Sequence, residues 1–160
     1  MKKLISVALV ILTLFAVSCK EEGLKVSDYS VADKKAELSA LELLAETIIY
    51  EKDGENVLNS DYFEYYFGDS ALLEGISDYI YYTSATTSVC EVGIFKVKDG
   101  ETKTALENAF TTRKENLIST YENYSKADVQ IAENMKNGSF DDVVWFVMTT
   151  DNASVTEVIE

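Results

Sequence analysis

The most regular apolar pattern in the chain lies between Glu101 and Tyr124. Leu106, Phe110 and Leu117 recur at spacings that place them on one face of a helix, while charged residues occupy the other faces. The pattern predicts a long amphipathic helix over residues 101–124.

Shorter segments also carry helical patterns. Leucine and isoleucine residues at three- and four-residue spacing predict a first helix within residues 33–52, ended by Asp53-Gly54. The other candidates are a helical turn over residues 61–67 ended by Gly68, a short helix or loop up to Gly75, a helix over residues 126–135, and a last helix over residues 154–160.

Three segments have the composition of β-strands. Residues 78–84 (DYIYYTS) and 89–97 (VCEVGIFKV) are rich in aromatic and β-branched side chains, and the small polar link between them predicts a hairpin. Residues 143–149 (VVWFVMT) are apolar at both odd and even positions up to Met148, so both faces of this strand should be buried. This predicts a central strand covered on both faces. Asn137-Gly138 predicts a turn before that strand.

This order of elements predicts an α+β domain. We expect a small, mainly antiparallel sheet of about three or four strands, packed by the long amphipathic helix and by the shorter helices. A ferredoxin-like or otherwise mixed sheet stays open as an alternative, and the patterns do not predict the strand order.

The chain begins with a pattern that predicts export. Met1-Lys2-Lys3 is positively charged, and residues 4–17 form an uncharged apolar run. As a helix this run is roughly 21 Å long, which is short of the ~30 Å hydrocarbon core of a bilayer. A signal peptide therefore fits better than a permanent transmembrane span.

The apolar run ends in Phe15-Ala16-Val17-Ser18-Cys19, which resembles the bacterial lipobox. In that motif small residues precede a cysteine that is acylated through its sulfur. We therefore expect residues 1–18 to be a lipoprotein signal peptide, Cys19 to carry lipid such as palmitate, and the protein to sit on the extracytoplasmic face of the cell membrane. Ordinary signal cleavage is the alternative. Residues 19–32 are then a tether and residues 33–160 a single globular domain.

The charge of the chain limits its partners. It has 14 basic and 28 acidic residues, a formal charge of −14. Loss of Lys2 and Lys3 with the signal peptide leaves 12 basic residues against 28 acidic ones, or −16. Such a surface repels nucleic acid and anionic headgroups, so we expect no nucleic-acid partner. An envelope protein or a neutral or cationic small ligand is compatible with it.

The chemistry available for metal binding or catalysis is limited. The chain has no histidine, and Cys19 and Cys90 are its only cysteines. Cys90 lacks the second ligand that zinc sites or Cys-His catalysis require, and the acidic loops lack EF-hand spacing. We therefore expect no metal and no cofactor.

Two isolated charges stand out from their apolar surroundings. Arg113 is the only arginine and falls within the apolar stripe of the predicted long helix, while Glu91 lies among apolar residues of a predicted strand. Because a buried charge is costly unless it is paired, we expect Arg113 and Glu91 to form an ion pair that docks helix on sheet. The alternative is that Arg113 holds an anionic ligand.

Tyrosine and phenylalanine cluster over residues 62–67 and 79–82. These rings have two interpretations. They form an exposed platform for a sugar or an extended peptide, or helix and strand geometry sends about half of them into the core. The second interpretation needs no ligand and is the one we expect.

The chain resembles a known family through residues 91–99 (EVGIFKVKD), Arg113 in the predicted long helix, Tyr124 and the predicted strand over residues 143–149. The family consists of small bacterial lipoproteins, mainly from Gram-positive anaerobes, that are built on a domain of unknown function. The resemblance spans about residues 37–160 and is sharp only at residues 90–99 and at Arg113. The chain departs from the family pattern at Asn123 and at residues 139–142, where a Gly-Asn-Tyr turn is expected. The resemblance implies a lipoprotein and no particular activity.

These observations favour a non-catalytic binding or interaction domain held at the membrane by a lipid anchor. The chain has no nucleophile elbow, no phosphate-binding glycine loop and no zinc motif. Two alternatives stay open. One is a small carboxylate-dependent hydrolase of cell-wall glycan, and the other is a ligand-binding accessory protein of a transporter.

Overall fold

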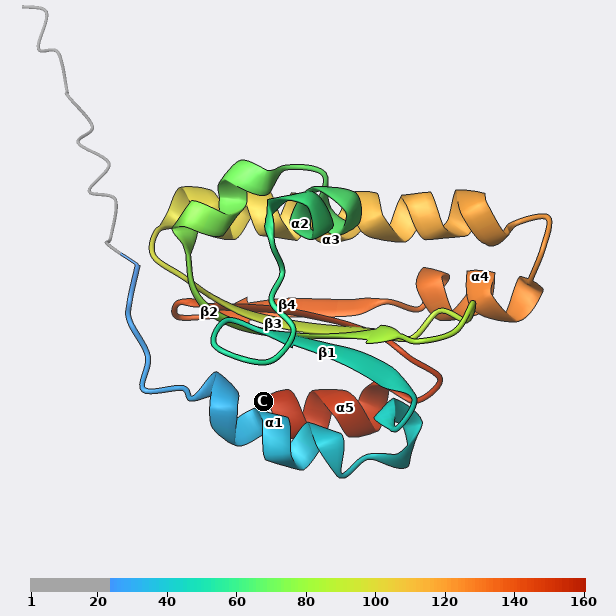
Figure 1. Cartoon of the computed structure of the whole chain (residues 1–160), viewed down its shortest axis with the longest axis horizontal. Helices are drawn as coiled ribbons and strands as arrows, with labels where there is room; N and C mark the ends of the chain where they lie inside the picture. The colour runs from blue at the N-terminus through green and yellow to red at the C-terminus, as the bar shows by residue number, and fades with distance from the viewer. Residues whose placement is uncertain (1–23) are drawn as a thin grey trace, which may run out of the picture.

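A computed structural model describes residues 24–160 and shows an antiparallel sheet with helices on both faces (Figure 1). The strands are β1 (Thr47–Glu51), β2 (Ile76–Ser84), β3 (Glu91–Val97), β4 (Lys136–Phe140) and β5 (Val143–Met148). The helices are α1 (Val31–Ser39), α2 (Ser60–Phe67), α3 (Gly100–Tyr121), α4 (Lys126–Glu133) and α5 (Asn152–Ile159). Two 3-10 helices, η1 (Glu42–Leu44) and η2 (Ser70–Gly75), complete the order.

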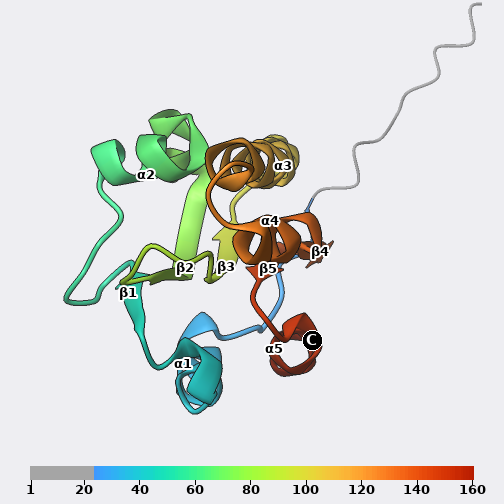
Figure 2. The ribbon, with the colours of Figure 1, turned by 90° about the vertical axis from the view of Figure 1, so that its right-hand side faces the viewer.

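The sheet has five strands in the order β1-β2-β3-β5-β4, and all neighbouring strands run antiparallel. The predicted combination of one antiparallel sheet with a long helix is confirmed. The predicted number of strands, three or four, is wrong. The sheet has five because β1 and β4, which the patterns did not predict, form its two edges. Figure 2 looks along the sheet and shows α2, α3 and α4 on one face and α1 and α5 on the other.

The first helix predicted over residues 33–52 is wrong in its second half. Helix α1 ends at Ser39, and the chain enters β1 at Thr47. The leucines and isoleucines of this region have helical spacing, but Ile48 and Ile49 are β-branched and pair with Thr83 and Tyr82 of β2. Pairing with an existing strand therefore overrides the helical pattern.

The turn predicted at Asn137-Gly138 is also wrong, because both residues lie within β4. The chain reverses at Asp141 instead, which adopts the left-handed conformation with a φ of 43°. Gly138 lies beneath the indole of Trp145, and a Cβ there would be 2.7 Å from Cζ2 of that ring. The glycine therefore permits close packing between two strands rather than a turn.

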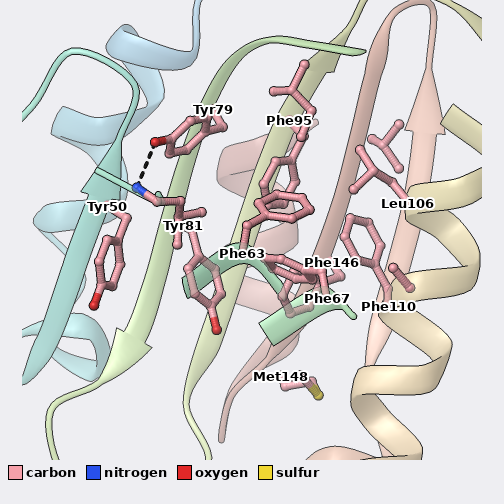
Figure 3. Packing of buried hydrophobic residues seen from close by; sticks show 14 of the residues in the cluster. Tyr50, Phe63, Phe67, Tyr79, Tyr81, Phe95, Leu106, Phe110, Phe146 and Met148 are labelled. Carbon is pink, nitrogen blue, oxygen red and sulfur yellow. Dashed lines mark hydrogen bonds between the residues drawn. The ribbon is translucent and has the colours of Figure 1, made fainter. Parts of the chain in front are cut away.

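Each face of the sheet carries its own core. Along β2, Tyr79 and Tyr81 point to the face covered by α2 and α3, while Ile80 and Tyr82 point to the face covered by α1 and α5. All six residues of β5 are buried, which confirms the prediction of a central strand covered on both faces. On the α3 side, eight of the eighteen buried residues are aromatic, and Figure 3 labels these rings.

Helix α3 holds its position on the sheet through one apolar stripe. Its N-cap, Asp99, accepts a 2.7 Å hydrogen bond from the backbone N–H of Thr102. Leu106, Phe110 and Leu117 are buried against the sheet. The long helix predicted from this stripe is confirmed, ending three residues earlier than expected.

The N-terminal segment that precedes α1 is docked on the domain. Asp142 accepts hydrogen bonds from both the backbone N–H and the hydroxyl of Ser27. Lys96 donates to the carbonyl oxygens of Ser27 at 3.0 Å and of Tyr29 at 3.1 Å. The expected tether covers residues 19–32. Its later part, residues 24–32, therefore belongs to the folded body, and residues 19–23 lie outside the described residues. Within residues 24–160, no helix is both long and apolar enough to cross a membrane.

Candidate functional site

Arg113 of α3 and Glu91 of β3 meet beneath the helix. Nη2 of Arg113 lies 2.6 Å from Oε1 of Glu91, and Nε lies 3.2 Å from Oε2. The guanidinium and the carboxylate therefore form a two-bonded pair of the fork-to-fork kind. Only 13% of the Arg113 side chain and 4% of the Glu91 side chain are exposed.

The position of Glu91 follows from strand register. Glu91 is the first residue of β3 and lies opposite Thr83 of β2 and Met148 of β5, at the last rung of the sheet. Because residues directly opposite one another in adjacent strands share a face, the Glu91 carboxylate points to the same side as Thr83. Arg113 reaches it from one turn before Leu117 on the buried stripe of α3.

The local environment keeps the Arg113 guanidinium charged and oriented. Burial alone lowers the pKa of Arg113, but the hydrogen bonds and the negative charge of Glu91 outweigh burial and raise that pKa above its usual value. The guanidinium carbon also lies 5.2 Å from the centre of the Tyr66 ring, within range of a cation–π contact. Within residues 24–160, no side chain or carbonyl accepts a hydrogen bond from Nη1 of Arg113.

A cavity of about 160 Å³ opens beside the Arg113–Glu91 pair. Its lining is mainly polar: Tyr65, Tyr66, Thr83, Ser84, Thr86, Ser88, Glu91, Arg113 and Tyr121 carry hydrogen-bonding groups, and Val89 and Leu117 complete it. The cavity lies between α2, α3 and the loop that joins β2 to β3. We call it the Arg113 cavity.

Hydroxyl groups of the β2–β3 loop form one wall of the Arg113 cavity. The hydroxyl oxygens of Ser84, Thr86 and Ser88 lie 2.9 to 3.2 Å from one another in a triangle. The hydroxyl of Tyr121 donates to the carbonyl oxygen of Thr87 at 2.6 Å, which holds the loop against α3. Backbone N–H groups of Thr86 and Ser88 also donate to this triangle, so the wall accepts as it stands and donates only when a hydroxyl turns out of the triangle.

Tyr81 places a buried hydroxyl next to the Arg113–Glu91 pair. The side chain is fully buried, and among residues 24–160 its hydroxyl is the one buried side-chain polar atom without a hydrogen-bond partner. Burial and then the charge of Glu91 raise the pKa of Tyr81 well above 10, so the group remains a neutral hydroxyl. The charge of Arg113 and then the nearby Thr83 hydroxyl partly offset this rise in pKa, although no hydrogen bond of normal geometry joins Tyr81 to Thr83.

Tyr79 and Tyr81 differ in how their hydroxyls are used. The Tyr79 hydroxyl accepts a 2.9 Å hydrogen bond from the backbone N–H of Leu58, drawn as a dashed line in Figure 3. The Tyr81 hydroxyl points in another direction and has no such line. An unpaired buried hydroxyl costs free energy. Tyr81 does not line the Arg113 cavity itself but lies behind Thr83 and Glu91, which do.

Residues 58–149 match a protein family that is described as a domain of unknown function, DUF4358. The chain belongs to this family. The matched segment includes every residue that lines the Arg113 cavity, so the cavity lies wholly within the family domain. No curated protein and no solved structure matches the chain. The lipoprotein character of the family stays a prediction.

The structure describes only one of the two cysteines, Cys90. Cys19, the expected lipid attachment site, lies outside the described residues. Cys90 is partly buried, its thiol lies 3.7 Å from the carbonyl oxygen of Leu43, and burial followed by the charge of Glu91 raises the pKa of Cys90 to about 11. A thiol with that pKa is a poor nucleophile at neutral pH. In the part of the chain that the structure covers, no group of three His, Cys, Asp or Glu side chains has the geometry of a metal site.

The aromatic clusters divide between core and surface. Phe63, Phe67 and Tyr81 are buried, whereas Tyr65 is 73% exposed at the rim of the Arg113 cavity and Tyr62 is 48% exposed. The structure thus agrees with the interpretation that sends part of each cluster to the core.

A second hollow of about 280 Å³ lies on the side of the sheet near α1. Glu51, Asp53 and Asp78 line it. Nζ of Lys35 forms an ion pair with Oε1 of Glu51 at 2.7 Å. Carboxylates are thus found together here and not in the Arg113 cavity, where Glu91 is the only one.

Sequence reasoning singled out Arg113 and Glu91 and missed Tyr81 and the three loop hydroxyls. The signal for Tyr81 was present in the spacing of β2, because residues 79, 81 and 83 share a face. Its lack of a partner depends on packing and leaves no trace in the sequence.

Proposed function

We propose that this chain is a lipid-anchored extracytoplasmic protein whose domain binds a small ligand in the Arg113 cavity without transforming it. The observation that carries the proposal is a mainly polar cavity at the paired Arg113 and Glu91, with the unpartnered Tyr81 hydroxyl buried behind the lining residues Thr83 and Glu91. Folded proteins rarely leave a buried hydroxyl without a partner, so the Tyr81 hydroxyl calls for an explanation, and ligand sites combine a concave surface with a few polar groups of this kind.

The lining of the Arg113 cavity suits binding better than catalysis. Both oxygens of Glu91 accept hydrogen bonds from Arg113, and no second carboxylate lines the cavity. A glycosidase needs two carboxylates that face each other across its substrate. The hydroxyls of Ser84 and Ser88 have no imidazole or amine base among the lining residues.

The docked N-terminal segment supports an arrangement in which the cavity faces away from the membrane. Lys25 makes the first charged contact of the segment, with Asp141 at 3.1 Å. From Cys19 to Lys25 the chain spans at most about 22 Å, which would hold an anchored domain close to the bilayer. The segment docks at the Asp142 end of the sheet, whereas the β2–β3 loop lies at the opposite end, about 20 Å away along β3 (Figure 1).

The anchor is tested by metabolic labelling with an alkyne analogue of palmitate in a bacterial host that processes lipoproteins. We expect label on the wild-type protein and none on Cys19→Ser, with Cys90→Ser as the matched control that keeps its label. Unchanged labelling of Cys19→Ser would overturn the anchor and leave the binding proposal standing.

Binding is tested by native mass spectrometry of full-length protein released from membranes into detergent. We expect an adduct of small mass on the wild-type protein, recovered chemically unchanged, and less of it on the double variant Ser84→Ala/Ser88→Ala. Ser139→Ala on β4 is the control, since Ser139 lies outside the cavity lining. Absence of any adduct, or an equal amount on all variants, would overturn binding in this cavity.

The hollow near α1 is the candidate active site for the alternative function, a hydrolase of cell-wall glycan. Glu51, Asp53 and Asp78 are the acidic residues that favour this second candidate function. Release of reducing sugar from peptidoglycan that is lost in both Asp53→Asn and Asp78→Asn would support it. No release by the wild-type protein would remove it.

A further inference from the structure

We propose that the Arg113 cavity is selective for a neutral, hydroxyl-rich ligand of about the size of one sugar ring. The proposal rests on the proposed function above and names the class of ligand. It follows from four properties of the cavity: its charge, its hydrogen-bonding groups, its rim and its size.

The charge of the cavity disfavours ions of either sign. The one cation and the one anion of its lining are paired with each other at 2.6 Å, so little net charge remains for a ligand. An anion would meet a guanidinium that Glu91 already neutralises, on a chain with a formal charge of −14. A cation would meet a carboxylate whose two oxygens are both engaged and would lie beside the Arg113 charge. A neutral ligand has neither penalty.

The hydrogen-bonding groups of the cavity match a ligand that both donates and accepts. Ser84, Thr86 and Ser88 bond to one another, and Ser84 and Thr86 also accept from backbone N–H groups, so a free lone pair remains on Ser88 and a proton becomes free when a hydroxyl turns toward a ligand. Nη1 of Arg113 has protons to donate, and the hydroxyls of Thr83 and Tyr65, which also line the cavity, can donate and accept. A polyhydroxylated molecule offers both kinds of group from each oxygen, which a carboxylate or an ammonium group does not.

The rim of the cavity offers an aromatic surface. Tyr65 is 73% exposed and lies edge to face against Tyr66, with ring centres 5.0 Å apart. Tyr66 is itself held under the Arg113 guanidinium. A sugar ring has a face of C–H groups as well as an edge of hydroxyls, and an exposed tyrosine ring can pack against that face. Tyr65 is thus suited to cover a ligand whose hydroxyls point inward.

The size of the cavity limits the ligand to one ring. About 160 Å³ is smaller than the 300 to 1,000 Å³ typical of pockets for drug-sized molecules. A monosaccharide or a short polyol fits this limit, whereas an oligosaccharide would have to extend past Tyr65 into solvent.

The test is ligand-detected saturation-transfer NMR on the full-length protein in detergent micelles at pH 6. The neutral probes are glucose, galactose and N-acetylglucosamine, and the charged probes are glucuronate and protonated glucosamine. We expect at least one neutral probe to bind saturably and at least tenfold more tightly than either charged probe. Tyr65→Ala and Ser84→Ala should each weaken that binding by about 3- to 10-fold, the effect of one lost contact. Tyr62→Ala is the matched control on the same helix and should leave it unchanged.

The other outcomes separate the two proposals. A charged probe that binds as tightly as the neutral ones, with the same loss in Tyr65→Ala, would overturn the ligand class and retain binding in the cavity. A neutral probe whose binding ignores both cavity variants would place the site elsewhere and overturn this inference. If no probe binds, the ligand class is wrong, and the native mass spectrometry described above still decides whether the cavity binds anything.

Discussion

Strand β3 carries a charged side chain near each end, and the two ends are completed in different ways. At one end, Lys96 and Asp142 are joined by the chain's own N-terminal segment, whose Ser27 bonds to both of them. At the other end, Glu91 and Arg113 bond to each other beside a hydroxyl-lined cavity, and Tyr81 has no partner within residues 24–160. The first end is satisfied by folding alone, whereas the second retains unused hydrogen-bonding groups.

This difference suggests what each end is for. Lys96 and Asp142 together hold the N-terminal segment at Ser27. Asp142 accepts from the N–H and the hydroxyl of Ser27, and Lys96 donates to its carbonyl oxygen. The Arg113 cavity presents comparable groups without a segment of the described chain across them. The first arrangement therefore fixes the position of the N-terminal segment, and the second is suited to a ligand from outside.

The largest effect is expected from removal of Arg113. Arg113→Met leaves the buried Glu91 carboxylate without its partner and should lower the free energy of unfolding by about 3 kcal/mol. Urea denaturation measures this loss. The double variant Glu91→Leu/Arg113→Met should recover most of it, because no buried charge remains. Lys25→Met removes an exposed pair and serves as the control, with a change under about 0.5 kcal/mol. Equal stability of Arg113→Met and wild type would contradict a docking role for the pair.

The opposite end of β3 is tested by Asp142→Asn. This change removes the charge that Lys96 faces at 3.6 Å and should lower the free energy of unfolding by about 2 kcal/mol. Amide hydrogen exchange should rise over residues 25–29, which Asp142 holds in place. Asp141→Asn, one residue earlier and paired only with exposed Lys25, should leave that exchange nearly unchanged. Similar exchange in both variants would show that Asp142 does not hold the segment.

A smaller effect distinguishes the two buried tyrosines. Tyr79→Phe leaves the buried N–H of Leu58 without an acceptor and should cost about 1 to 2 kcal/mol. Tyr81→Phe removes a hydroxyl that has no partner and should change stability by less than about 0.5 kcal/mol, or raise it. Thermal unfolding of both variants without ligand provides the measurement. A loss in Tyr81→Phe as large as that in Tyr79→Phe would mean that folding already uses the Tyr81 hydroxyl.

The smallest effect is a dependence on acid. Burial raises the pKa of Asp142, but the hydrogen bonds from Ser27 and the charge of Lys96 outweigh it and lower that pKa below 3.8. A lowered folded-state pKa contributes stability that is complete above the unfolded-state value and is lost as pH falls through the folded-state value. The difference in unfolding free energy between wild type and Asp142→Asn should thus be constant from pH 7 to about 5 and shrink below pH 4. A difference that grows on acidification would have the wrong sign for this account.

The sequence predicted the parts of the fold that depend on local pattern. The stripe of Leu106, Phe110 and Leu117 was enough for α3, and the polar link before Val89 was enough for the β2–β3 hairpin. Strand β1 was missed because Ile48 and Ile49 fit a helical stripe and a strand equally well, and only pairing with β2 decides between them. The sheet therefore has five strands instead of the three or four expected, because edge strands such as β1 and β4 are weakly marked in the sequence.

The candidate site was accessible to sequence reasoning only in part. Arg113 and Glu91 are each a single charge in an apolar pattern, so the cost of burying a charge pointed to both. The hydroxyls of Ser84 and Ser88 and the unpartnered Tyr81 could not be found in this way. Their arrangement depends on strand register and on how the loop folds back toward Tyr121.

The contrast between a satisfied and an unsatisfied end of β3 is tested most directly at Tyr81 itself. Full-length protein in detergent micelles, with tyrosine labelled by carbon-13 at Cζ, gives one NMR signal per ring, and Tyr79→Phe and Tyr81→Phe assign the two signals of interest. On addition of the neutral sugar that binds, we predict that the Tyr81 signal shifts saturably while the Tyr79 signal, whose hydroxyl is bonded to Leu58, stays in place. A Tyr81 signal that does not move under saturating sugar would contradict the account.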